Sequence, residues 1–421
     1  MSDSSASPDV LKWLVLALAA ITIAGSYYSY DAIAPIADLL RSQRHFSQSQ
    51  IASLNAVFSL PNIPLSLVGG IIIDRIGAAR ASLIAAMLSF IGCVLTAAGD
   101  PYALMVAGRL IFGVGTETLY IALLVGLSQW FATGGAALSI ALFFSMARVG
   151  SYFADISPRW AASAYADGWQ TPLWLAAGFT GAGVIAAFGY WLLDRRYGAL
   201  IGRSPPSERF RWSDLRGFKA SFWDILWLNV LFASVFFPFR STFSIQFFQD
   251  VKGLTLAQAG LTNSWVFFAA IIATPLCGLI ADRYGRRATL LMVAAALLPL
   301  TFFVLGATHA SLWVSTAMMG VSFSVIPAVI WPSTAMLVEK QRIGTAFGLI
   351  NMLQSLGLTV SNSVAGALND QFHASASHPA GYIPMLVFFG AAGSVALVAA
   401  VRLWICEFGA GRSGLEEPRI A

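Results

Sequence analysis

The sequence predicts an all-α membrane protein with twelve transmembrane helices arranged as two six-helix repeats. Composition gives the class: 57% of the 421 residues are hydrophobic and 11% are charged, whereas a soluble domain carries about 25% charged residues. Apolar runs long enough to cross a hydrocarbon core of about 30 Å give the helices. A short loop motif that occurs once in each half of the chain gives the repeat.

Twelve apolar runs follow one another along the chain. Short alternating strands are absent, which favours helices as the spanning elements. The first run continues into SYYSYDAIAP without a small-residue cleavage pattern, so we interpret it as a span and not as a signal peptide. The predicted spans are about 11–36, 49–72, 79–98, 102–126, 135–157, 170–193, 222–247, 256–281, 287–306, 310–333, 343–367 and 381–405.

The longest polar stretch in the interior of the chain separates the first six spans from the last six. It predicts an N-terminal bundle (1–193), a cytoplasmic linker (194–221) and a C-terminal bundle (222–421). An even number of spans puts both termini on the side of the linker. Few basic residues then fall on the other side, and this asymmetry predicts cytoplasmic termini. The basic residues on the far side are Arg41, Arg44, Arg159 and Lys252.

The loop motif follows the second span as GGIIIDRIGAAR (69–80) and the eighth as GLIADRYGRRATL (278–290). Its glycines let helices approach closely, its aspartates can accept from a helix N-terminus, and its arginines suit the headgroup level. Contacts of this kind brace one conformation and break in another. The residues predicted for this structural and gating role are Gly70, Asp74, Arg75 and Gly77 in the first copy and Gly278, Asp282, Arg283, Gly285 and Arg286 in the second.

Few ionisable residues remain at membrane depth, and such residues usually mark a substrate or ion path. Glu117 in the fourth span suits an ammonium group, and Arg148 in the fifth suits a carboxylate, which a guanidinium binds with two parallel hydrogen bonds. The alternative is a structural ion pair between the two. Arg109 lies about 12 Å from Glu117 along the fourth helix at ~1.5 Å per residue, so we expect a structural or gating role for it.

Polar and aromatic residues on other spans complete the predicted site. The tyrosines of SYYSYD form either a cavity wall or an interfacial aromatic belt. The polar stripe of the eleventh span either joins helices or meets a peptide bond. The predicted substrate-binding residues are Glu117, Arg148, Tyr30, Asp31, Tyr120, Arg240, Trp331, Asn351 and Gln354.

The duplicated loop motif and Arg109-x-x-x-Gly113 resemble the major facilitator superfamily over the whole chain, although the fifth span lacks the Gly-Pro motif of its drug/proton antiporters. Local strings resemble a narrower branch, the lysosomal dipeptide transporters and their bacterial relatives. These strings are SYYSYD, GRLIFGVGTETL, SMARVGS, FPFRSTFSIQFF, IWPSTAMLVEK and GTAFGLINMLQSLGL. The resemblance implies that Glu117 binds the amino end of a peptide, that Arg148 binds its carboxylate, and that transport is uniport.

No Asn-x-Ser/Thr acceptor occurs in the chain, so we expect a bacterial protein of the cell inner membrane, without a glycosylated accessory subunit. The leading hypothesis is an alternating-access transporter of small zwitterions, most of all dipeptides, acting as a monomer among membrane lipids. A second is a proton-coupled symporter of organic anions in which Glu117 carries the proton. A third, a receptor or an intramembrane enzyme, lacks support because the sequence has no metal cluster, Ser/His/Asp set or nucleotide loop. We expect no cofactor, no metal and no nucleic-acid partner.

Overall fold

A computed structural model describes residues 8–132, 134–198, 210–308, 311–409 and 413–417. Within these ranges the chain is helical apart from turns and one isolated bridge between Ser375 and His378. Eleven helical segments are long and apolar enough to cross a membrane, and helix α7 (Ala136–Asp155) occupies the place of the predicted fifth span. The predicted all-α membrane fold is confirmed.

The first half of the chain contains ten helices among the described residues. They are α1 (Pro8–Asp31), α2 (Ile33–Arg44), α3 (Gln48–Ser59), α4 (Asn62–Ile76), α5 (Ala78–Ala98), α6 (Tyr102–Trp130), α7, the short α8 (Ser157–Trp160) and α9 (Ala162–Asp167), and α10 (Gln170–Tyr197). Two predicted spans are interrupted. The first turns at Ala32 between α1 and α2, and the second breaks ahead of α4 at Pro61, where proline cannot donate a helical hydrogen bond.

The second half begins with a 3-10 turn, Trp212–Gly217, and continues through seven further α-helices. They are α11 (Ala220–Pro238), α12 (Ser244–Lys252), α13 (Leu256–Tyr284), α14 (Arg287–Ala307), α15 (Leu312–Leu337), α16 (Ile343–Gln371) and α17 (Ile383–Phe408). A π turn, Phe239–Phe243, joins α11 to α12 directly after Pro238. Such turns are rare and accumulate at functional positions. This one carries Arg240.

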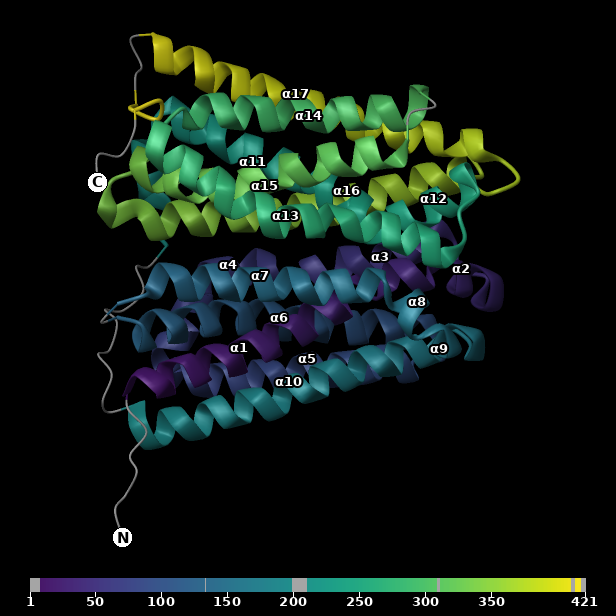
Figure 1. Cartoon of the computed structure of the whole chain (residues 1–421), viewed down its shortest axis with the longest axis horizontal. Coiled ribbons are helices and arrows are strands. Elements are labelled where there is room, and N and C mark those ends of the chain that lie inside the picture. Colours follow the sequence, from purple (N-terminus) through teal and green to yellow (C-terminus); the bar gives the residue numbers. More distant parts are fainter. Residues whose placement is uncertain (1–7, 133, 199–209, 309–310, 410–412, 418–421) are drawn as a thin grey trace.

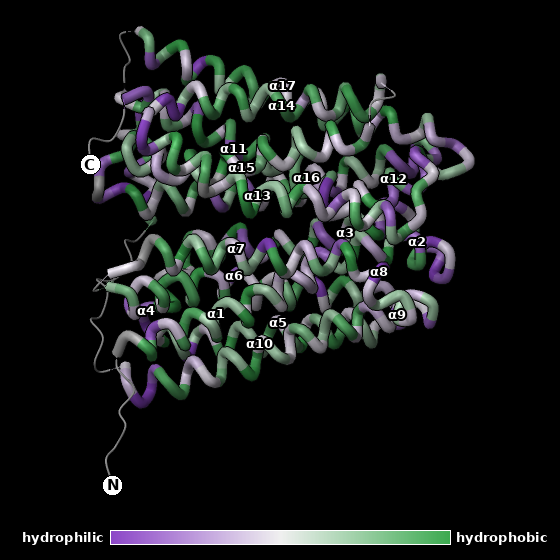
Figure 2. The backbone as a smooth tube through the Cα atoms, viewed as in Figure 1, coloured by the Kyte–Doolittle hydropathy of each residue, from purple (hydrophilic) through white to green (hydrophobic). Residues whose placement is uncertain are grey.

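The helices form two layers, one of α1–α10 and one of α11–α17, and the start of α1 and the end of α17 lie at the same end of the bundle, called here the end of the termini (Figure 1). Hydrophilic residues gather toward the two ends of the bundle, with isolated ones between (Figure 2). The layers touch through α3 and α16, α7 and α13, and α2 and α12. Part of the predicted linker, 199–209, lies outside the described residues.

Both copies of the loop motif turn at a glycine with positive φ, +89° at Gly77 and +70° at Gly285, a conformation that other residues rarely adopt. In the second copy Asp282 pairs with Arg287 at 3.0 Å. Among the other motif residues, Asp74, Arg75, Arg283 and Arg286 are exposed, and Gly70 and Gly278 are half-buried.

Candidate functional site

Two charged side chains lie on neighbouring helices of the first layer, and one of them, Arg148, meets the second layer. Glu117 lies midway along α6, Arg148 lies on α7, and both are half-buried. Within the described part of the chain no ion pair joins them, and Glu117 has no hydrogen bond. The alternative of a structural pair between the two is therefore not formed here, and neither charge is matched by the other at contact distance.

Arg148 is surrounded by aromatic rings from both layers. Its Cζ lies 5.3 Å from the ring centre of Tyr27, 5.0 Å from that of Phe267 and 4.9 Å from that of Phe323. Ring faces attract a cation but accept no strong hydrogen bond. The Nη1 atom is buried without a hydrogen-bond partner. A guanidinium in this position retains a free donor that a carboxylate would accept.

Tyr27 and Tyr120 connect the two charges. The phenol of Tyr27 lies within electrostatic range of both Glu117 and Arg148, and so does the phenol of Tyr120. Tyr120 also stacks on Phe144 with ring centres 6.0 Å apart. These contacts place Glu117, Arg148 and the two phenols in one neighbourhood of the first layer.

Asp31 and Arg240 lie in a separate, buried cluster between the layers. Arg240 Nη1 is 2.6 Å from Asp31 Oδ1, its Nη2 bonds to Asp155, and no side chain of the three is more than 2% exposed. Asn263 Nδ2 donates to the other oxygen of Asp155 at 3.0 Å. Asp31 and Arg240 are both predicted substrate-binding residues. In this structure Arg240 pairs with Asp31 and Asp155, where α1, α7 and the π turn meet.

Arg109 is buried among backbone carbonyls and donates four hydrogen bonds. It reaches the carbonyls of Ser29, Tyr30 and Leu54 at 3.1 to 3.4 Å and Asn55 Oδ1 at 2.5 Å. It therefore fastens α6 to α1 and α3 inside the first layer. Tyr30, predicted at the substrate site, packs here as well, with its ring 4.6 Å from that of Phe58.

The predicted residues of the second layer have partners outside the aromatic group around Arg148. Gln354 accepts a hydrogen bond from Asn229 at 2.8 Å, and Trp331 packs edge-on against Phe347 at 5.2 Å. Asn351 is half-buried on α16, and its carbonyl accepts from Ser355 Oγ at 2.9 Å.

Several residues of this region are missing from the predicted substrate-binding set. Tyr27 belongs to the tyrosines of SYYSYD, which were expected to form a cavity wall or an aromatic belt, and it stands one helical turn before Tyr30. Phe267 and Phe323 lie in apolar runs and carry no signal beyond hydrophobicity. Asn55 and Asn263 are single amides in otherwise apolar helices, and such amides are a usable sign of buried polar contacts.

A family model described as Major Facilitator Superfamily matches residues 19–361 and 241–419. The chain belongs to the Major Facilitator Superfamily. Among solved structures, the nucleoside transporter NupG superposes with a TM-score of 0.73 at 13% identity, covering 94% of this chain and 100% of that one. A bacterial homologue of the human lysosomal transporter Spinster, in an inward-facing and occupied conformation, gives 0.70 at 14% identity over 94% and 96%. At these identities the likeness shows the superfamily fold alone.

Curated relatives are closer in sequence. The lysosomal dipeptide transporter MFSD1 of Danio rerio is 29% identical over 398 residues, which cover 91% of this chain and 84% of the relative. The Homo sapiens protein of the same name is 28% identical, covering 94% and 86%. A probable sulfoacetate transporter of Cupriavidus necator is 20% identical over 82% and 84%. The resemblance to the dipeptide-transporter branch is thus confirmed, and this superfamily member is a multi-pass membrane transporter, in a family of transporters and not of enzymes.

Proposed function

We propose that the chain transports dipeptides or closely related zwitterions, with Glu117 holding the ammonium group and Arg148 the carboxylate. The observation that carries the proposal is the unpartnered state of both charges: Arg148 Nη1 is buried without an acceptor, and Glu117 has no hydrogen bond among the described residues. A buried charge without a partner is costly. A ligand with one charge of each sign offsets both costs at once. The similarity to MFSD1 proteins supports the same ligand class.

The position of Arg148 relates binding to movement of the two layers. Its guanidinium belongs to the first layer, while Phe267 and Phe323 belong to the second. Alternating access requires the layers to rock about the site. A bound carboxylate stabilises Arg148 whichever end of the bundle is open, and the rings shield the pair from water.

We place both termini in the cytoplasm and the protein in the bacterial inner membrane, acting as a monomer.

Polar bridges join α2 and α3 of the first layer to the π turn and α12 of the second. Helices α2 and α12 lie at the end of the bundle opposite the start of α1 (Figure 1). Beyond the Asp31–Arg240–Asp155 cluster, Asn55 Nδ2 donates to Thr242 Oγ1 at 2.9 Å and Arg41 pairs with Asp250 at 3.0 Å. We propose that these bridges form the closed gate of a state that opens toward the termini. When the bridges separate, the substrate passes at their end of the bundle. In that second state the motif loops brace the end that holds the termini.

We propose uniport because both charges are used to hold the ligand and neither is reserved for a proton. A second candidate, proton-coupled symport of organic anions, draws on the similarity to a probable sulfoacetate transporter. In that case Arg148 binds the anion and Glu117 carries the proton. Dipeptide uptake into proteoliposomes that is equal with and without a pH gradient supports uniport, and uptake that requires the gradient supports symport.

Uptake by variants tests the site. We expect Glu117→Gln and Arg148→Ala each to reduce dipeptide uptake by at least about a hundredfold, since each leaves one ligand charge unpaired in a low-dielectric site. The matched controls Glu339→Gln and Arg159→Ala change exposed residues of the same types and should transport normally. Melting temperature in detergent verifies that the variants fold. Full transport by either site variant would remove the proposed binding mode.

A further inference from the structure

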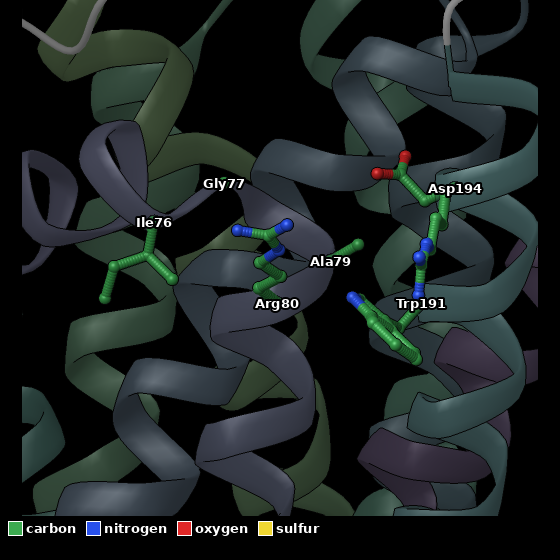
Figure 3. Close-up of a pocket in the computed structure, with 7 residues that line it drawn as sticks. Ile76, Gly77, Ala79, Arg80, Trp191 and Asp194 are labelled. Atoms are coloured by element: carbon green, nitrogen blue, oxygen red, sulfur yellow. The ribbon is translucent and has the colours of Figure 1, made fainter.

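A cavity of about 150 Å³ lies between the start of α5 and the end of α10, at the end of the bundle that holds the termini. Arg148 is not among the residues that line it. Figure 3 shows Arg80 standing between the α4–α5 loop and the wall formed by α10, with Trp191 and Asp194 on that wall. The lining residues are Ile76, Gly77, Ala79, Arg80, Trp191, Asp194 and Arg195.

The lining carries unmatched positive charge. Within the described residues neither Arg80 nor Arg195 has an ion pair or a hydrogen bond, and Arg195 only approaches the ring of Trp191, with its Cζ 5.6 Å away. Asp194 accepts from Trp130 Nε1 at 3.1 Å. Two guanidinium groups and one carboxylate leave a net charge of +1. The N-terminus of α5, which has no side-chain cap, adds partial positive charge at Gly77.

Below this basic rim, each helix presents an apolar stripe on its exposed surface. On α5, Arg80 is followed at helical spacing by Ile84, Met87 and Ile91, all exposed. On α10, Ile185, Phe188 and Leu192 lead up to Arg195 in the same way and are also exposed. Residues three and four apart share a helix face, and the two helices pack against each other. Charge at the rim with adjoining apolar stripes matches an amphiphile.

The start of α14, which follows the second copy of the loop motif, corresponds to the start of α5, and it shows what such a helix start binds in this chain. At the start of α14, the backbone N–H groups of Arg286 and Arg287 donate to the carbonyls of Glu416 and Leu415 at 3.2 and 2.9 Å. The N–H of Thr289 donates to the carboxylate of Glu416 at 2.8 Å. The chain's own C-terminal segment thus places an anion on this helix start. The first copy has a cavity and two free arginines there.

We propose that the cavity binds the phosphodiester headgroup of an anionic phospholipid, such as a phosphatidylglycerol. The phosphate oxygens accept from Arg80 and Arg195. The acyl chains lie along the stripes of α5 and α10. The bound lipid fixes the first motif loop to α10, as the segment 413–417 fixes the second loop to α17. This inference does not depend on which solute the protein carries.

Native mass spectrometry of the full chain in detergent tests the site. The probes are palmitoyl-oleoyl phosphatidylglycerol, the phosphatidylcholine with the same acyl chains, and inorganic phosphate. We expect the anionic lipid to bind at least about tenfold more tightly than the zwitterionic one, because each basic residue near a membrane surface favours an anionic lipid by about fivefold. Equal binding of the two lipids overturns the proposal. So does inorganic phosphate that displaces the lipid at equal concentration, since it would indicate a site for a free anion.

Variants place the binding at this cavity. Arg80→Gln and Arg195→Gln should each weaken phosphatidylglycerol binding about fivefold, and the double variant should bind both lipids equally. The matched control is Arg196→Gln, which changes an exposed arginine one position away that does not line the cavity. Asp194→Asn keeps an acceptor for Trp130 and removes the opposing charge, so it should bind the lipid more tightly. A loss in Arg196→Gln equal to that in the site variants, or weaker binding by Asp194→Asn, overturns the proposal.

Discussion

Two arginines approach the same phenylalanine ring, and the protein treats them differently. The Cζ of Arg240 lies 3.8 Å from the ring centre of Phe267 and that of Arg148 lies 5.0 Å from it. Arg240 has no exposed side-chain surface and pairs with two carboxylates. Arg148 is half-buried, and its Nη1 has no hydrogen-bond partner. The same residue type thus serves as a fixed bridge in one place and as a free donor a few ångströms away.

The difference shows how a transporter can use one arginine to join its two layers and another to bind its substrate. An arginine matched by Asp31 and Asp155 joins the two layers and has its charge occupied. An arginine surrounded by rings is attracted to them, but its hydrogen-bonding capacity remains for a ligand. Both arginines contact the ring of Phe267. A shift of this ring caused by one arginine therefore alters the surroundings of the other. This comparison yields three predictions, which begin with the largest effect.

Truncation of each arginine to alanine should separate the two roles. Arg240→Ala leaves two carboxylates buried without a cation, which typically costs 3–5 kcal/mol, so its melting temperature should fall strongly. Arg148→Ala removes a guanidinium that has no fixed acidic partner, and its stability should change by less than about 1 kcal/mol. Thermal unfolding of both variants in the same detergent measures the difference.

The pair of carboxylates supplies the control for this prediction. Combining Arg240→Ala with Asp31→Asn and Asp155→Asn removes the uncompensated charges and should recover a large part of the lost stability, because replacing a whole buried charge cluster costs less than breaking it. If Arg148→Ala melted as low as Arg240→Ala, the distinction between a bridging arginine and a free one would be wrong.

A smaller effect is expected at Asp370, where one layer caps a helix of the other. Its two carboxylate oxygens accept from the backbone N–H groups of Gln48 and Ser49, both at 2.8 Å, at the start of α3. In Asp370→Asn, the amide has only one acceptor oxygen and turns a donor toward the second N–H. We expect a loss of about 1–2 kcal/mol in stability, measured by thermal unfolding.

The matched change at an exposed aspartate of α2, Asp38→Asn, should leave the melting temperature unchanged. Because Asp370 connects the layers, the Asp370 variant should also open more readily at the end opposite the termini. An unchanged melting temperature in Asp370→Asn would show that these two hydrogen bonds do not hold the layers together.

The helical fold followed from features that are local in sequence. Apolar runs of bilayer length predict spans, and a glycine at Gly77 and at Gly285 predicts a turn in each copy of the motif. Glu117 and Arg148 were identifiable for the same reason, since a charge inside an apolar run is visible without a structure. The helix break at Pro61 is also a local feature. It was not predicted because residues 49–72 form a single hydrophobic run.

The partners of these charges were beyond the reach of the sequence. By itself, Arg240 in the seventh span looks like Arg148 in the fifth, and only the meeting of α1, α7 and the π turn gives Arg240 two carboxylates. Nor could Phe267 be singled out, since the chain has 30 phenylalanines and most hydrophobic positions of a spanning helix tolerate one. Which ring meets a cation depends on how the layers pack.

The smallest effect is expected at Phe267 itself, and it is the most direct test that the two arginines share a neighbour. Phe267→Leu keeps an apolar side chain but removes the ring face, whose attraction for a buried cation is worth about 0.5–2 kcal/mol. Both measures should move together: the melting temperature falls slightly through Arg240, and the apparent affinity in dipeptide uptake weakens a few-fold through Arg148. The adjacent Phe268→Leu changes an exposed ring that contacts Trp265 and should leave both measures intact. If Phe267→Leu altered stability but not uptake, the ring would belong to the bridge alone, and Arg148 would be held by Tyr27 and Phe323.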